Sequence, residues 1–180
     1  AVNQVLDFVK LTPYPPIIIV SHSWLTQLKL ADLLDVEGRA KGVKVSVDDV
    51  ILSLNTLKRM IHPAKLVVIG NVPTSDGLNL YDIFTRPKVV TSPDFKLNKY
   101  LTSDVRPQLW ELNLRLKEAS EGGRAFVFLN PFDVLCKSKR CRNVDEEKHL
   151  IYSDTSHLSK FGARFVIHAF LPELTMLLDK

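Results

Sequence analysis

Three short apolar runs along the chain predict buried β-strands. They are Ile17–Ser21 (IIIVS), Lys65–Gly70 (KLVVIG) and Arg124–Asn130 (RAFVFLN). Continuous runs of β-branched and aromatic residues suit a parallel sheet that is covered on both faces. We therefore expect the three segments to belong to one parallel sheet.

Helical spacing of apolar residues marks the segment between the first and second predicted strands. Ser46 and Asp48 are candidate N-caps, apolar residues then recur at helical spacing from Val50 to Ile61, and Pro63 ends the pattern. The residues before the first strand, Ala1 to Lys10, form a short amphipathic stretch. Helices are expected in both places.

Two further helices follow later in the chain. Pro107 stands near the start of one pattern, and Gly122 and Gly123 stop it. The last helix begins near Ser159, which is expected to cap it, and Pro172 is expected to kink or restart it.

The alternation of helices and strands predicts a three-layer α/β/α fold with a mostly parallel sheet, as one domain over residues 1–180. Between the second and third strands, Thr74–Thr102 is irregular and is expected to run over the surface. Three strands are few for a sheet, and the chain opens on a helix. We therefore expect the fold to lack its first strand.

Composition and charge narrow the class of protein. Apolar residues make up 46% of the 180, which favours a globular protein, and no apolar run is long enough to cross a bilayer. The net charge is +4, but apart from the loop at residues 137–140 and Arg142 the positive residues are scattered. Because no aromatic platform accompanies them, nucleic-acid binding is not expected.

The two cysteines, Cys136 and Cys141, lie five positions apart. No second Cys/His pair is placed to complete a zinc site, so no metal is predicted. A disulfide that closes a small loop is the favoured interpretation, with a pair of free thiols as the alternative. A disulfide would indicate an oxidising compartment.

Asp154 and His157 carry the clearest candidate chemistry. They are three positions apart, just before the last predicted helix. In a turn, the carboxylate can bond one ring nitrogen of His157 and leave the other as a general base for a serine supplied elsewhere. The alternative is that Asp154 caps the helix and His157 is a surface residue.

The stretch from Asn130 to Val166 resembles the last block of the SGNH (GDSL-like) esterases and acyltransferases. Its pattern Y-x-D-x-x-H-L-S-x-x-G-A, here Tyr152 to Ala163, is similar to the branch fused to membrane acyltransferase type 3 proteins. PPIIIVSHSW and KLVVIGNVP resemble the blocks that end on a tryptophan, here Trp24, and on a proline, here Pro73. The resemblance implies a flavodoxin-like SGNH fold in which Asp154 and His157 are two triad residues.

The chain also departs from the family pattern. No Gly-Asp-Ser occurs in it, so by block order the serine belongs upstream of Ala1. The segment Ser21–Trp24 corresponds to the family's Gly-x-Asn-Asp oxyanion block without its residues. Ser21, Ser23, Trp24 and Pro73 remain the candidate substrate or oxyanion region. Ser21, Ser23 and Ser159 are weak candidates for the nucleophile, because nothing glycine-rich surrounds Ser21 and Ser23, and Ser159 serves as the cap.

The resemblance implies that the chain is the C-terminal part of an O-acyltransferase or esterase acting on a carbohydrate, with acetyl as the expected acyl group. Its partners would be an upstream segment with the serine block and a membrane acyltransferase domain. No cofactor is expected for this chain, and an acyl donor such as acetyl-CoA is implied for the parent only. The location would be extracytoplasmic. The alternative is an inactive SGNH-like module that binds glycan or a partner chain.

The sequence predicts the roles of the remaining histidines and aromatic residues less sharply. His22 and His62 are expected to be ordinary histidines, and His149 and His168 have no carboxylate at a convincing spacing. Trp24 is either a lid over a pocket or a core residue. Tyr152 either orients Asp154 or is simply buried.

Overall fold

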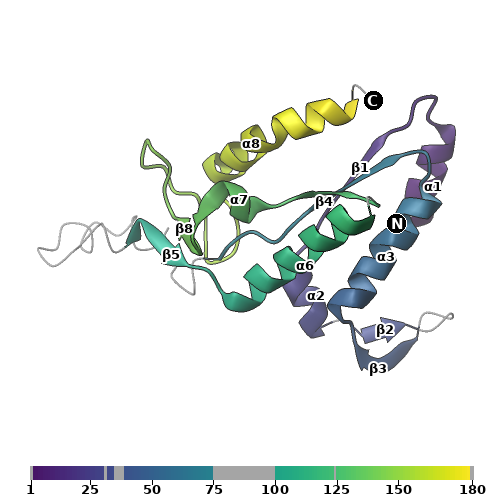
Figure 1. The fold of residues 1–180 in the computed structure, drawn as a ribbon, viewed down its shortest axis with the longest axis horizontal. Coiled ribbons are helices and arrows are strands. Elements are labelled where there is room, and N and C mark those ends of the chain that lie inside the picture. The colour runs from purple at the N-terminus through teal and green to yellow at the C-terminus, as the bar shows by residue number, and fades with distance from the viewer. Residues whose placement is uncertain (1, 31, 35–38, 75–99, 124, 179–180) are drawn as a thin grey trace, which may run out of the picture. The chain divides into compact units, whose positions relative to one another are not determined.

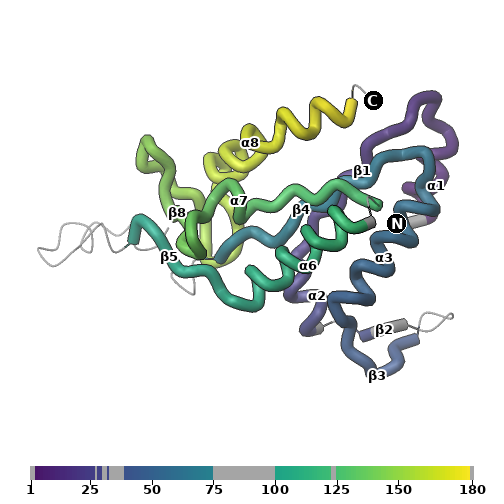
Figure 2. Tube along the Cα trace, in the orientation of Figure 1, coloured from purple at the N-terminus to yellow at the C-terminus, as the bar shows by residue number. Residues whose placement is uncertain are grey.

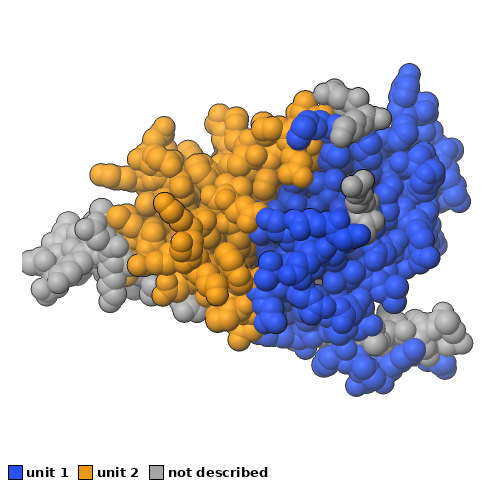
Figure 3. Space-filling model, viewed as in Figure 1, with its two compact units in different colours: residues 1–71, 111–130, 176–180 blue, residues 72–110, 131–175 orange. Residues whose placement is uncertain are grey.

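The computed structural model of the protein describes residues 2–30, 32–34, 39–74, 100–123 and 125–178 (Figure 1). Most of the predicted excursion Thr74–Thr102, residues 75–99, lies outside the described residues. The chain divides into two compact units (Figure 3). Unit 1 comprises Ala1–Asn71, Glu111–Asn130 and Met176–Lys180, and unit 2 comprises Val72–Trp110 and Pro131–Thr175.

Unit 1 contains the predicted parallel sheet. Strands β1 (Ile17–Ser21), β4 (Lys65–Ile69) and β6 (Val127–Leu129) pair in parallel in the order β1-β4-β6, and Figure 2 traces their path. Ile17 lies opposite Lys65, and Val67 lies opposite Val127. All three predicted strands are confirmed, although β6 is shorter than the predicted run.

The predicted helices of unit 1 are α1 (Val2–Leu11), α3 (Val47–Met60) and most of α6 (Pro107–Gly123). Helix α2 (Trp24–Leu30) was not predicted. Ser46 caps α3 by accepting from the Asp49 backbone N–H, and the Asp49 carboxylate accepts from the Ser46 backbone N–H. This capping box explains why α3 starts at Val47, directly after Ser46.

The core of unit 1 lies on one face of this sheet. Leu66 and Val68 of β4 belong to one apolar cluster with Leu54 of α3 and Leu116 of α6. Val67 is also fully buried, and because strand residues alternate between faces it points to the opposite side. A central strand buried on both faces is what the continuous apolar run predicts.

A small antiparallel hairpin in unit 1 was not predicted. Strands β2 (Asp32–Leu34) and β3 (Ala40–Lys44) pair, and the Lys44 amine lies 2.7 Å from an Asp32 carboxylate oxygen. Every residue of β3 is exposed. Because such a strand has no buried face, its sequence carries no alternating apolar pattern.

Unit 2 is built around a second small sheet and two helices. Its elements are β5 (Thr102–Asp104), α7 (Pro131–Leu135), β7 (Cys136–Lys137), β8 (Arg140–Arg142) and α8 (Lys160–Leu178), whose last residues belong to unit 1. The sheet order is β5-β8-β7, with antiparallel pairing. Cys136 and Cys141 face each other across the β7–β8 hairpin and form a disulfide, which confirms the favoured interpretation.

Helix α8 begins as predicted and continues through Pro172. Ser159 caps it, because its hydroxyl accepts from the Gly162 N–H at 3.0 Å. Of the two alternatives for Pro172, a kink or a restart, the restart is wrong, since α8 continues through it to Leu178. The carbonyl that Pro172 leaves without a helical partner belongs to His168, an exposed residue, where water can hydrate it.

By length and composition alone, α8 is apolar enough to cross a membrane. The core helix of a globular protein meets the same criterion, so this property does not decide its role. Three residues on one side of α8, Gly162, Val166 and Phe170, are buried.

A buried asparagine joins the ends of β4 and β6 in unit 1. The Asn113 amide oxygen accepts from the backbone and side-chain N–H groups of Asn71, at 2.9 and 3.2 Å. Its amide nitrogen donates to the Asn71 carbonyl at 3.0 Å and to the Asn130 side chain at 2.8 Å. Asn113 is almost fully buried, so water cannot replace these bonds.

Replacing Asn113 with alanine is expected to lower the free energy of unfolding by about 3 kcal/mol, because it leaves buried groups of Asn71 without partners. Urea unfolding followed by circular dichroism measures the change. Asn3→Ala, at an exposed position of α1, is the control and should shift stability by less than about 0.5 kcal/mol. Equal effects of the two substitutions would contradict the role of the Asn113 bonds.

Gly162 allows the first turn of α8 to lie directly against Ile151 of unit 2. A Cβ on Gly162 would overlap the Ile151 backbone carbonyl, whereas a Cβ on Gly122 of α6 would meet open space. Gly162→Ala is therefore expected to destabilise by about 3 kcal/mol. Gly122→Ala should be neutral or stabilise by up to about 1 kcal/mol, because alanine favours a helix.

Thermal unfolding of the two glycine variants measures this difference. If the Gly162→Ala protein had the same melting temperature as the wild type, α8 would not need this close approach.

Candidate functional site

The Asp154–His157 segment is a tight turn that precedes α8 in unit 2. Tyr152 and Leu158 form an isolated antiparallel bridge, and the Ser153 N–H donates to the His157 carbonyl at 2.9 Å. Residues 153–157 therefore form the closed end of a small hairpin.

The Asp154 carboxylate organises this turn. Its Oδ1 accepts from the backbone N–H groups of Ser156 and His157, both at 2.8 Å, and its Oδ2 lies 2.7 Å from His157 Nδ1. The two backbone bonds, followed by the bond from the His157 ring, lower the pKa of the Asp154 carboxyl to about 2. Asp154 is therefore ionised at neutral pH.

The ionised carboxylate determines which nitrogen of His157 carries the proton. A carboxylate can only accept, so Nδ1 must donate to Asp154 and Nε2 carries the lone pair. The His157 side chain is 78% exposed and that of Asp154 is 42% exposed. The structure brings the predicted pair together with its imidazole open to an incoming group.

The nearest hydroxyl in the turn is not placed to receive help from this base. Ser156 Oγ lies 3.5 Å from His157 Nδ1, the nitrogen that is already bonded to Asp154. Ser159 Oγ donates to the Leu150 carbonyl and accepts from the Gly162 N–H, so it is engaged as the helix cap.

Tyr152 supports the turn from inside unit 2. Its side chain is fully buried, and its hydroxyl has no hydrogen-bond partner within the described part of the chain. Burial raises the pKa of this phenol well above its usual value. Of the two alternatives for Tyr152, the structure supports burial, because the hydroxyl does not bond Asp154.

The candidate oxyanion residues are divided between the two units. Ser21 and Ser23 are exposed at the end of β1 in unit 1, and the Ser23 hydroxyl lies 2.7 Å from that of Thr26. Trp24 is buried and donates through Nε1 to the Ile69 carbonyl at 2.9 Å, so it is a core residue rather than a lid. Pro73 is buried in unit 2.

The structure reveals a second carboxylate–imidazole pair. His149 Nδ1 lies 2.9 Å from Asp145 Oδ2, and Asp145 Oδ1 accepts from the backbone N–H groups of Glu147 and His149. The expectation that His149 lacks a carboxylate partner is wrong. The pair depends on a loop in which Lys148 adopts a positive φ of 67°, a conformation that residue type does not indicate.

Burial and hydrogen bonding oppose each other at Asp145. Burial acts to raise the pKa of its carboxyl, but the hydrogen bonds from His149 and the Glu147 backbone outweigh burial and hold that pKa below its usual value. Asp145 is 16% exposed and His149 is 37% exposed, so this pair is more sheltered than Asp154 and His157.

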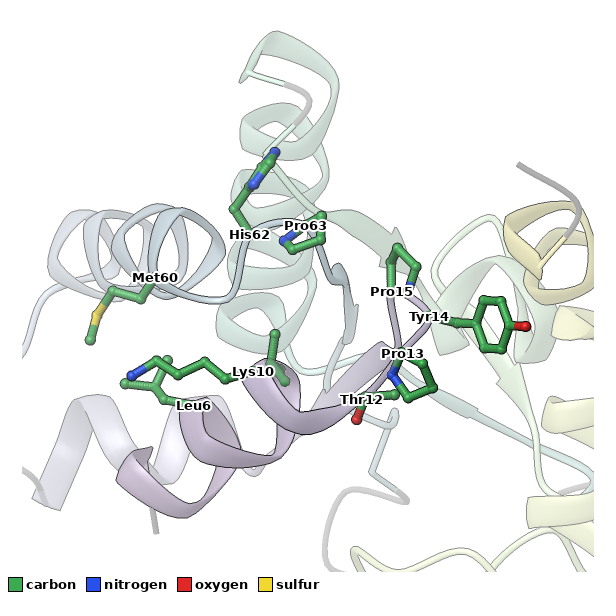
Figure 4. A pocket seen from close by; sticks show the side chains of 10 residues that line it. Leu6, Lys10, Thr12, Pro13, Tyr14, Pro15, Met60, His62 and Pro63 are labelled. Atoms are coloured by element: carbon green, nitrogen blue, oxygen red, sulfur yellow. The ribbon is translucent and has the colours of Figure 1, made fainter.

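A cavity of about 430 Å³ in unit 1 has no carboxylate–imidazole pair in its lining. It lies at the C-terminal ends of α1 and α3, and Figure 4 shows Tyr14 pointing away from Lys10 and Met60. Its side chains do not converge on one point. Within the described ranges, no three His, Cys, Asp or Glu side chains gather as a metal ion would require.

Comparison with solved structures identifies the fold. A lipopolysaccharide acetyltransferase periplasmic domain from Salmonella ser. Paratyphi A is 14% identical, with a TM-score of 0.65. The match covers 97% of this chain and 60% of that one, so the chain spans less than two thirds of that structure. This similarity confirms the predicted α/β/α fold class with a parallel sheet.

A second structure, described as a proposed platelet activating factor from Streptococcus pneumonia, is 11% identical. The match covers 96% of this chain and 90% of that one, but its TM-score of 0.41 is too low to support an argument. No curated protein matches the chain.

The family is decided by the sequence match rather than by these structures. The family model described as "SGNH domain (fused to AT3 domains)" matches residues 1–172, nearly the whole chain. The chain belongs to the family of SGNH domains that are fused to AT3 domains.

Proposed function

We propose that this chain provides the acid–base pair of a serine-dependent O-acyltransferase or esterase that acts on a carbohydrate. The observation that carries the proposal is the 2.7 Å bond between ionised Asp154 and His157 Nδ1, in a chain of the SGNH family. The serine comes from a segment upstream of Ala1, because residues 1–180 contain no Gly-Asp-Ser.

In the first step, His157 Nε2 takes the proton of the serine hydroxyl as its oxygen attacks the acyl carbonyl carbon. Asp154 keeps the ring in the required tautomer and stabilises the imidazolium that forms. The tetrahedral intermediate then collapses, the leaving group takes the proton from His157, and an acyl-serine remains.

In the second step, a sugar hydroxyl or water attacks the acyl-serine. His157 removes the proton of the attacking hydroxyl and returns it to the serine oxygen, which restores the site. Backbone N–H groups near the serine would stabilise both oxyanions, at roughly 3–4 kcal/mol for each donor. We expect the acyl group to be acetyl, with a donor such as acetyl-CoA used by the whole protein.

The parent protein is proposed to carry a membrane acyltransferase domain and to hold this chain on the extracytoplasmic side. The family description, a domain fused to AT3 domains, supports the first part. The Cys136–Cys141 disulfide supports the second, because disulfides persist in oxidising compartments. The Salmonella relative is itself described as a periplasmic domain.

A second candidate function is a catalytically inactive SGNH-like module that binds glycan or a partner chain. The missing Gly-Asp-Ser favours it. The residues upstream of Ala1 would discriminate between the two candidates. A Gly-Asp-Ser followed by a helix there would favour the enzyme.

His157→Ala in the protein with its upstream segment is expected to lower acyl transfer by at least about 10³-fold, because the serine loses its base. Asp154→Asn should have a similar effect, because the side-chain NH2 that would face His157 Nδ1 is a donor and favours the other tautomer. Transfer of a labelled acetyl group to polysaccharide measures both. His62→Ala and Asp7→Asn, at exposed positions of unit 1, are the controls and should retain activity.

Unchanged transfer in His157→Ala would contradict the proposal. Hydrolysis of p-nitrophenyl acetate by residues 1–180 alone, lost in His157→Ala, would place the nucleophile within this chain instead.

The Asp154 carboxyl is expected to titrate with a midpoint of about 2. Because its folded pKa is depressed, its contribution to stability is complete above the unfolded value of about 4 and is lost as the pH falls toward 2. Carboxyl ¹³C chemical shifts in an NMR titration measure the midpoint. In His157→Ala the midpoint should rise but stay below 3.8, because the backbone bonds are the larger cause.

A titration midpoint near 4 in the wild type would show that the turn is not formed in solution. No acid limb from Asp154 is expected in the activity profile above about pH 4.

A further inference from the structure

Unit 2 contains a cavity of about 460 Å³ that lies apart from the Asp154–His157 turn. One wall is the loop that follows β8, which lies beside the start of α8 (Figure 1), and the other wall is a face of α8. Residues that line it include Glu146, Glu147, His149, Phe161, Arg164 and Phe165. The α8 residues recur at positions i, i+3 and i+4, so they share one side of the helix.

The aromatic wall of this cavity is fixed in position. The rings of His149 and Phe161 stack with centroids 4.3 Å apart and planes within 3° of parallel. His149 is held in turn by its bond to Asp145. Phe161 is 53% exposed, so an apolar ring face stays available to a ligand without the entropy cost of fixing it on binding.

The polar groups around the cavity include both donors and acceptors. Glu146 is 2.6 Å from Arg142, whose guanidinium lies over the Phe165 ring at 5.1 Å. Glu147 is 82% exposed, and Arg164 contributes a second guanidinium nearby. The lining carries three carboxylates, from Asp145, Glu146 and Glu147, and one guanidinium, from Arg164, so it is acidic overall and does not suit a polyanion.

We propose that this cavity binds a carbohydrate and serves as a subsite for the acceptor glycan. A sugar offers hydroxyl groups that donate to carboxylates and accept from guanidinium, and an apolar C–H face that packs on an aromatic ring. These are the groups gathered at Phe161, Glu147 and Arg164. As an acceptor subsite, the cavity rests on the proposed function.

The cavity is near enough to the proposed catalytic turn for one glycan chain to reach both. Phe161 follows His157 by four positions, so their Cα atoms can be no more than about 14 Å apart. An oligosaccharide held on Phe161 can therefore place a neighbouring sugar hydroxyl at His157.

Glycan binding tests the proposal without acyl transfer. The probe is the polysaccharide released from Salmonella lipopolysaccharide, together with a mixture of methyl hexosides. Phe161→Ala is expected to weaken binding by about fivefold in saturation-transfer NMR titrations. Phe8→Ala removes a phenylalanine of similar exposure, 55%, from α1 of unit 1, and it should leave binding unchanged.

Two further variants keep the test independent of folding. Phe161→Trp retains an aromatic face and should retain binding. Glu147→Gln replaces a carboxylate that is 82% exposed and lies 3.6 Å from His149 Nδ1, and it should weaken binding by about threefold. Unchanged binding in both Phe161→Ala and Glu147→Gln would overturn the proposal. The proposal would also be overturned if the wild-type protein bound neither the polysaccharide nor the methyl hexosides.

Kinetics of the protein with its upstream segment separate this proposal from the proposed function. Phe161→Ala should raise KM for the acceptor and leave kcat unchanged, whereas His157→Ala should lower kcat and leave glycan binding intact. If Phe161→Ala loses binding but His157→Ala still transfers, the proposed function and the acceptor role fail, and glycan binding by the cavity stands. If His157→Ala is inactive but Phe161→Ala and Glu147→Gln both bind normally, only the subsite fails.

Discussion

The fold of the candidate site depends on one carboxylate that makes two kinds of bond. Asp154 Oδ1 closes the turn through two backbone N–H groups, and Oδ2 fixes the ring of His157. Hydrogen bonds to an ionised acceptor are stronger than neutral ones, and the same charge permits acceptance only. The loop conformation and the imidazole tautomer are therefore determined together, and neither can change without the other.

An exposed turn cannot rely on burial for its position, so it is held by the backbone on both sides. The Ser159 N–H donates to the Ile151 carbonyl at 2.8 Å, and the Ile151 N–H donates to the Asn143 carbonyl at 2.9 Å. Asn143 is fully buried and its side chain donates to the Tyr100 carbonyl at 2.9 Å. A continuous series of hydrogen bonds thus joins the turn to the interior of unit 2, and Gly162 allows α8 to approach the same segment.

Sequence analysis succeeds here where local chemistry controls structure. Ser46 before α3, Pro107 at the start of α6 and the spacing of Asp154 and His157 each signal a local arrangement that forms. It fails where the backbone adopts a left-handed conformation at an ordinary residue. Lys148, Ser138 and Lys139 all have positive φ, and they form the Asp145–His149 loop and the β7–β8 turn. The spacing of Cys136 and Cys141 indicates that the β7–β8 loop closes, but it does not indicate the conformation of the turn. The Asp145–His149 loop and the exposed β2–β3 hairpin have no signal in composition or periodicity.

The two Asp–His pairs of unit 2 show why a hydrogen-bonded dyad alone does not define a catalytic site. Both carboxylates accept backbone N–H groups through one oxygen and meet the imidazole Nδ1 through the other. They differ in what surrounds the ring, since His149 is stacked on Phe161 while His157 is 78% exposed. A base that serves a hydroxyl from another segment must be open to it, whereas a ring that supports a platform must be fixed. The same local geometry can thus serve two purposes, and the environment of each imidazole separates them.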